Sequence, residues 1–200
     1  KNKMAYSKVG IFNMALNHLG ITASISTNSM NKDSKAIILN NFYETARDEV
    51  LKAFDWGFAN AYKDLTLSTE KSPNPRFPYV YDCPNDCIAG RAIIDTVKGD
   101  ERKFEPYINS IGEKSFLAEV ECARLRYTKR VEKEVLFEPE FVFALSYYLA
   151  ALTGESITGQ QKKADSCLQK YEWRLSKAKQ LNAQEGAADD EDNSQYYDIR

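Results

Sequence analysis

The fold of this 200-residue chain is constrained most by a helical periodicity that stops in the middle of the sequence and then resumes. Near both ends, apolar residues recur every three or four positions. Between Phe58 and Tyr127 that period is lost, and prolines, β-branched residues and aromatics become frequent. The pattern predicts an α+β fold with a four-helix bundle formed by residues 1–56 and 137–184. Residues 57–136 are predicted to form an inserted small antiparallel β domain.

Capping signals mark the ends of the predicted helices. Ser7 is suited to cap the start of the first helix, and Gly20 is suited to end it in a left-handed turn. Pro139 occupies the first position of the third helix, which we expect to end at Gly154. The fourth helix is predicted to open with the capping-box pattern Thr158-x-x-Gln161.

Two segments of the inserted domain alternate in the manner of β-strands, residues 77–81 and 116–122. Three prolines between residues 73 and 78 place the first of these strands at a sheet edge, because proline cannot donate to a ladder. Turns are predicted around Gly99 and Gly112.

Residues that commonly carry catalysis are scarce in this chain. It has four cysteines and one histidine, and it lacks a phosphate-binding loop, a nucleophile elbow and a dinucleotide fingerprint. Cys83 and Cys87 have neither the spacing of zinc ribbons nor that of redox dithiols. We therefore expect reduced thiols and no metal, cofactor, structural disulfide or enzymatic activity. His18 lies in the last turn of the first helix, where a partly charged imidazole would interact favourably with the helix dipole.

The C-terminal residues 185–200 differ in composition from the rest of the chain. They contain six acids and one base, a net charge of −5, which leaves residues 1–184 at +3. We expect them to form an extended acidic tail outside the core. The segment ends in Tyr196, Tyr197 and Ile199, which form a short peptide that a partner could anchor. The alternative is a chain end with no role.

Bases are concentrated in two places, and they raise a nucleic-acid-binding alternative. Residues 124–133 contain five bases, among them Lys129, Arg130 and Lys133, and the fourth helix carries six bases against two acids. A pI of about 5.6 and the interleaved glutamates favour instead a solvated face or a docking face for an acidic partner.

Membrane insertion and secretion are not expected from the sequence. The longest apolar runs end after five or six residues, whereas a spanning helix needs about 20 apolar residues. The first residues lack the apolar core and cleavage site of a signal peptide.

Several motifs, in order along the chain, resemble the tubular-tail adaptor (tubular tail protein A-like) family of head-to-tail connectors in short-tailed bacteriophages. The motifs nearest the N-terminus are Asn13-x-Ala15-Leu16-x-x-Leu19-Gly20, Tyr43-x-x-Ala46-Arg47-Asp48-x-x-Leu51 and Phe54-Asp55-Trp56-x-Phe58-Ala59. The later motifs are Tyr79-x-Tyr81-Asp82-Cys83-Pro84-Asn85-Asp86-Cys87, Tyr127-Thr128-Lys129-Arg130-Val131 and Phe137-x-Pro139-x-Phe141-x-x-Ala144-Leu145. Cys83 stands where leucine is usual in the family, and the polar linker at 22–31 and the acidic tail also depart from its pattern.

The resemblance implies a non-enzymatic structural protein of the virion. Such a subunit is made in the host cytoplasm and forms an oligomeric ring, typically of 12 copies, at the head–tail junction. The ring lies between the portal protein and the tail nozzle protein, and packaged double-stranded DNA passes through its lumen. For this chain, the resemblance implies portal binding by Tyr196, Tyr197 and Ile199, and we expect Lys129, Arg130 and Lys133 to form a DNA-channel or docking face.

Overall fold

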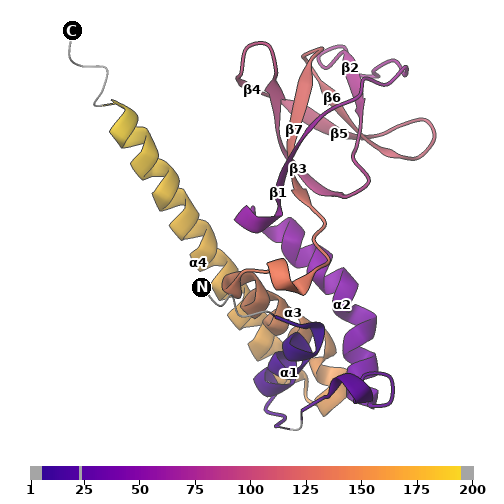
Figure 1. Cartoon of the computed structure of the whole chain (residues 1–200), viewed down its shortest axis with the longest axis vertical. Coiled ribbons are helices and arrows are strands. Elements are labelled where there is room, and N and C mark those ends of the chain that lie inside the picture. Colours follow the sequence, from indigo (N-terminus) through magenta and orange to yellow (C-terminus); the bar gives the residue numbers. More distant parts are fainter. Residues whose placement is uncertain (1–5, 23, 195–200) are drawn as a thin grey trace. The chain divides into compact units, whose positions relative to one another are not determined.

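The computed structural model describes residues 6–22 and 24–194, and beyond residue 180 it describes the backbone alone. Within these residues the chain is a mixed α+β protein with four α-helices and two small antiparallel sheets (Figure 1). It divides into two compact units, a helical unit of Lys1–Phe54 and Glu134–Arg200 and a β unit of Asp55–Lys133. The insert of the sequence analysis, 57–136, starts two residues later than the β unit and ends three residues later.

The helical unit is organised around α3. Its helices are α1 (Lys8–His18), α2 (Ser34–Ala53), α3 (Pro139–Thr158) and α4 (Gln161–Ser194), with short 3-10 turns η1 (Thr27–Ser29) and η3 (Glu134–Leu136). α3 packs against each of the other three helices. Its residues Phe141, Val142, Leu145 and Leu149 are completely buried, so α3 supplies the centre of this core.

The predicted ends of α1 are confirmed. Ser7 is the N-cap, and its hydroxyl accepts a hydrogen bond from the backbone N–H of Gly10 at 3.1 Å. Gly20 follows the helix with φ +78°, the left-handed conformation that glycine adopts without a steric penalty.

The prediction that Gly154 ends α3 is wrong. α3 continues to Thr158, and Gly159, with φ +66°, is its C-cap. Gly154 serves close packing instead, because a Cβ atom there would lie 2.9 Å from Leu19 Cδ2 and 3.0 Å from Ala164 Cβ. This glycine therefore lets α1 and α4 approach the last turns of α3 closely.

The predicted capping box at Thr158-x-x-Gln161 is also wrong. Thr158 is the last residue of α3, and its hydroxyl donates to the carbonyl oxygen of Gly154 at 2.6 Å. The same hydroxyl accepts from the N–H of Gln160 at 3.1 Å, so the threonine closes one helix rather than opening the next.

α4 corrects the prediction of an extended tail over residues 185–200. The helix runs through Ser194, so residues 185–194 are helical. A helix already nucleated by packing gains one hydrogen bond for each residue added, and Ala183, Ala187 and Ala188 favour the helical backbone. Residues 195–200 lie outside the described part of the chain.

The β unit consists of two antiparallel sheets. One has the strand order β1-β7-β3-β4 and the other has the order β2-β6-β5. The strands are β1 (Asn60–Asp64), β2 (Tyr79–Asp82), β3 (Cys87–Asp95), β4 (Glu101–Arg102), β5 (Phe104–Ile108), β6 (Lys114–Ala118) and β7 (Ala123–Lys129), preceded by the 3-10 turn η2 (Gly57–Ala59). The two predicted turns are present, with Gly99 and Gly112 at φ +79° and +84°.

Both predicted strands exist but are shorter than predicted. β2 begins at Tyr79, after Pro78, and it is an edge strand as the prolines indicate. β6 ends at Ala118, and residues 119–122 form the turn that leads into β7.

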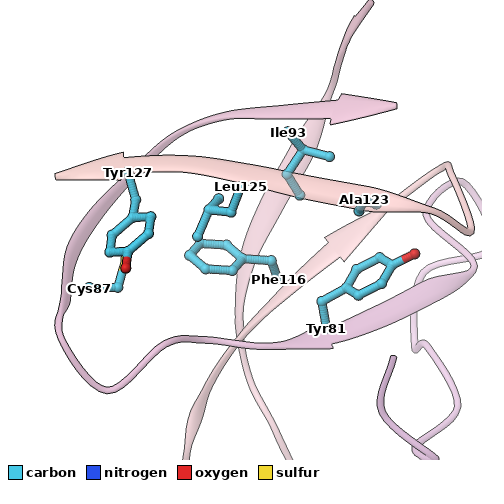
Figure 2. Packing of buried hydrophobic residues seen from close by; sticks show 8 residues of the cluster. Tyr81, Cys87, Ile93, Phe116, Ala123, Leu125 and Tyr127 are labelled. Carbon is cyan, nitrogen blue, oxygen red and sulfur yellow. The ribbon is translucent and has the colours of Figure 1, made fainter. Parts of the chain in front are cut away.

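The core of the β unit lies between its two sheets. Figure 2 shows Tyr81 and Phe116 of one sheet facing Ile93, Leu125 and Tyr127 of the other. Tyr81 is anchored by a hydrogen bond that its hydroxyl donates to the carbonyl oxygen of Val120 at 2.5 Å. Two sheets of three and four strands thus bury one shared apolar layer.

Candidate interaction surfaces

A row of cations follows one side of α4. Lys163, Lys170, Arg174 and Lys177 are separated by seven, four and three residues, the spacing that places side chains on one stripe of a helix. Asp165 and Glu172, the two acids among residues 161–180, fall outside this stripe. Four of the six bases of this helix therefore share one stripe.

Aromatic rings of α3 lie beneath these cations. The Arg174 guanidinium is 4.7 Å from the centre of the Phe143 ring and 5.4 Å from that of Tyr147. Lys170 Nζ is 5.9 Å from the Tyr147 ring. Each such contact at an exposed site stabilises the pair by about 0.5 to 1 kcal/mol and leaves the charge in contact with water.

The C-terminal end of the stripe includes an exposed tryptophan. Trp173 is 62% exposed, and Lys177 Nζ lies 5.3 Å from the centre of its ring. We call Lys170, Trp173, Arg174 and Lys177 the α4 basic face. An indole with this exposure, beside a cation, is typical of a residue that a partner covers.

His18 lies beside the α4 basic face and is not the charged cap that the sequence predicts. Its ring stacks on Tyr147 with the centres 3.7 Å apart, and Nε2 is 3.0 Å from the Ser146 hydroxyl. That hydroxyl donates to the carbonyl oxygen of Phe143, so we assign Nε2 as the donor to it. Burial, followed by the charges of Lys170 and Arg174, lowers the pKa of His18 to about 4. The imidazole is therefore neutral at physiological pH.

Lys129, Arg130 and Lys133 lie at the end of β7 and in the segment that follows it. Lys129 Nζ is 3.4 Å from Asp86 Oδ2, and the backbone N–H of Arg130 donates to the Asp86 carbonyl oxygen at 2.7 Å. Lys133 is exposed and is the last residue of the β unit. The structure thus brings the three residues into one exposed segment, with a carboxylate beside the first of them.

The neighbouring bases of β7 are also paired with carboxylates. Arg124 contacts Asp64 at 2.6 Å, and Arg126 contacts Asp55 at 2.5 Å. Arg91 lies 3.8 Å from the second oxygen of Asp55 and donates to Thr128. The positive charge of residues 124–133 is therefore largely compensated within the β unit, in contrast to that of α4.

Tyr196, Tyr197 and Ile199, the expected portal-binding residues, lie outside the described residues. In the sequence, Tyr196 comes two positions after Ser194, the last residue of α4.

Cys83 lies in the turn that follows β2, and Cys87 is the first residue of β3. The Cys87 thiol hydrogen-bonds Cys83, which lowers the pKa of Cys83 and raises that of Cys87. All four cysteines are free. Among the described residues, no group of three or more His, Cys, Asp or Glu side chains is placed to hold a metal ion. The chain's single histidine is in the helical unit, so Cys83 has no imidazole base within the β unit.

Two open hollows mark the surface of the β unit. One of about 410 Å³ is lined by residues 63–66 and 82–86, which include Cys83. The other, of about 490 Å³, lies between Arg76, Arg91 and residues 101–105. Arg91 and Arg102 of the second hollow already contact carboxylates.

One helix of the described part of the chain, α3, is long and apolar enough to cross a membrane by length and composition. Half of its apolar window is buried within the protein, which is the situation of a central core helix.

Neither a scan against protein-family models nor a search of curated proteins produced a match for this chain.

Proposed function

We propose that this chain is a subunit of the head-to-tail connector of a short-tailed bacteriophage, a structural virion protein without enzymatic activity. The motifs that resemble the adaptor family follow one another in that family's order, from α1 through the β unit to α3. We further propose that the four helices form the four-helix bundle of that fold, with the β unit inserted between α2 and α3.

The observation that carries the proposal is the length of α4. α4 has 34 residues, whereas α3, the helix on which it packs, has 20 (Figure 1). The additional 14 residues correspond to about 21 Å of helix at 1.5 Å per residue. We infer that this additional length serves a partner outside the subunit, since α3 is too short to pair with the whole of α4.

A connector subunit requires several partners, and the chain offers a surface for each. We assign the residues after α4, with Tyr196, Tyr197 and Ile199, to the portal protein. The exposed segment with Lys129, Arg130 and Lys133 is assigned to the lumen through which double-stranded DNA passes, or to a docking face. Copies of the chain contact one another around the ring through two different surfaces, as closed rotational assemblies require.

Capture by the portal protein tests this proposal. The purified chain is mixed with the portal protein encoded in the same genome, and the complex is weighed by native mass spectrometry. We expect a ring with a fixed number of copies per portal. Deleting residues 195–200 should weaken capture at least tenfold while the circular dichroism spectrum stays unchanged. A wild-type chain that remains unbound, or a truncated one that binds equally well, would contradict the proposal.

A nucleic-acid-binding module is the second candidate function, and the unpaired cations of the α4 basic face favour it. Such a module would bind duplex DNA tightly without any portal protein present. The measurement that separates the two candidates is the DNA affinity at physiological salt.

A further inference from the structure

We infer that the α4 basic face is a docking surface for the acidic segment of a second copy of this chain. The acidic segment is residues 185–192, which contain five carboxylates and no base (Glu185, Asp189, Asp190, Glu191 and Asp192). The inference deepens the proposed function, on which it rests in one respect: the second copy is the neighbouring subunit of the ring.

The cations of the basic face have no anionic partner among the described residues of their own subunit. No carboxylate oxygen of the described residues lies within 4.0 Å of Lys170, Arg174 or Lys177. The rings of Phe143, Tyr147 and Trp173 hold these charges in place. The face is thus preorganised for an anionic partner, and less side-chain entropy is lost when one binds.

The acidic segment cannot reach the basic face of its own chain. Both are parts of α4, and Lys177 and Asp189 are twelve residues apart, or about 18 Å along the axis. This separation exceeds the screening length of about 8 Å at physiological salt. Because one continuous helix cannot fold back on itself, the opposite charges can meet only between two molecules.

The carboxylates at the end of α4 favour a protein partner over DNA. A duplex lying along the α4 basic face would run towards five carboxylates on the same helix, and the whole chain carries a net charge of −2. A second copy can place the carboxylates of its acidic segment against these cations, and its own basic face can bind the acidic segment of a further copy. Each chain therefore presents one acidic end and one basic face, the heterologous pair of surfaces from which a closed ring is built.

Charge reversal on both sides of the contact tests the inference. One variant carries Lys170→Glu, Arg174→Glu and Lys177→Glu; a second carries Asp189→Lys, Asp190→Lys and Asp192→Lys; a third combines all six. Self-association is measured by sedimentation velocity at low and physiological salt. We expect each triple variant to associate at least about tenfold more weakly than wild type, because like charges then meet. The sixfold variant, which has the wild-type net charge, should regain association because the pairing is restored with reversed polarity.

Two controls separate the contact from net charge and from misfolding. Lys32→Glu, Lys71→Glu and Lys98→Glu reverse three exposed lysines elsewhere, and this variant should associate as wild type does. Thermal melts confirm that each variant is folded, and Lys170→Gln, Arg174→Gln and Lys177→Gln provide a milder set with a smaller expected loss.

Three outcomes would overturn the inference. They are a wild-type chain that stays monomeric at low salt, triple variants that associate as wild type does, and a folded sixfold variant that stays as weak as the triples. A loss of DNA binding in the first variant with unchanged self-association would assign the face to DNA instead. Portal capture is a separate measurement, made on a variant that lacks only residues 195–200. The connector role can therefore be contradicted while the α4 contact is supported, and the α4 contact can be contradicted while the connector role is supported.

Discussion

At the scale of single residues, burial and neighbouring cations outweigh the helix dipole in setting the charge of His18. The dipole at a helix C-terminus favours the protonated imidazole by about 0.3 to 1 kcal/mol at the surface. Against it act the loss of water around a half-buried ring and the charges of Lys170 and Arg174. The neutral form of the imidazole is therefore favoured, and the ring packs against Tyr147 of α3.

A pH dependence of stability follows from this neutral histidine. Its folded-state pKa of about 4 is below the ordinary value of 6.5, so between these values the unfolded chain binds a proton that the folded chain does not. The free energy of unfolding should therefore fall as the pH drops from 6.5 to 4. We expect a loss of about 1 to 2 kcal/mol, after allowing for solvent screening of a half-exposed ring.

Urea denaturation across this pH range measures the effect. His18 is the only histidine of the chain, so His18→Gln removes the titration and should flatten the profile between pH 4 and 6.5. Parallel profiles for wild type and variant would show that His18 is not the group responsible.

At the scale of helices and strands, the close approach of α1 and α4 to α3 depends on Gly154. In Gly154→Ala the new Cβ would lie 2.9 Å from Leu19 Cδ2 and 3.2 Å from the Ala164 backbone, so the helices must separate. Overpacking lowers the free energy of unfolding by about 1 to 3 kcal/mol, and the better helix propensity of alanine raises it by at most about 1 kcal/mol. We expect a net loss of about 1 to 2 kcal/mol by chemical denaturation.

The exposed neighbour Glu155 provides the matched control for that substitution. Glu155→Ala should change the free energy of unfolding by less than about 0.5 kcal/mol. A Gly154→Ala protein as stable as this control would mean that the three helices tolerate a methyl group at their crossing.

The sequence predicts the existence of elements better than their ends, and Gly154 shows why. A glycine near the end of an apolar stripe is compatible with a left-handed cap or with a helix crossing. Only the position of Leu19 and Ala164, residues far away in the sequence, decides between the two. Ser7 was predictable because its partner, the N–H of Gly10, is three residues away.

The same difference between local and distant information applies to the candidate surfaces. The bases of α4 and of residues 124–133 look alike in the sequence, and both are dense clusters. Strand pairing places Arg124 opposite Asp64, and tertiary contacts bring Asp55 to Arg126. On α4 the helical period separates cations from acids, so a periodicity count over residues 161–180 would have singled out the α4 basic face.

At the scale of the whole molecule, the two base-rich segments, β7 and α4, differ in where their counter-charges lie. The arginines of β7 are paired with carboxylates of the β unit. The sequence of α4 has six bases and two acids before residue 180, and five acids and no base after it. A helix with this polarity favours association with copies of itself over binding to a uniformly anionic polymer.

Weak DNA affinity is the consequence of this arrangement that is simplest to measure. Three cations of the α4 basic face displace at most about three counterions, so the logarithm of the binding constant should fall with the logarithm of salt concentration with a slope no steeper than about −3. We expect dissociation constants of about 10⁻⁴ to 10⁻⁶ M at physiological salt, equal for two unrelated duplexes in a fluorescence anisotropy titration. The Lys170→Glu, Arg174→Glu, Lys177→Glu variant should make this slope shallower, because its three phosphate contacts are lost. Nanomolar binding to one sequence at physiological salt would contradict the connector role and favour the nucleic-acid-binding module, because a preference of that size requires contacts to base edges.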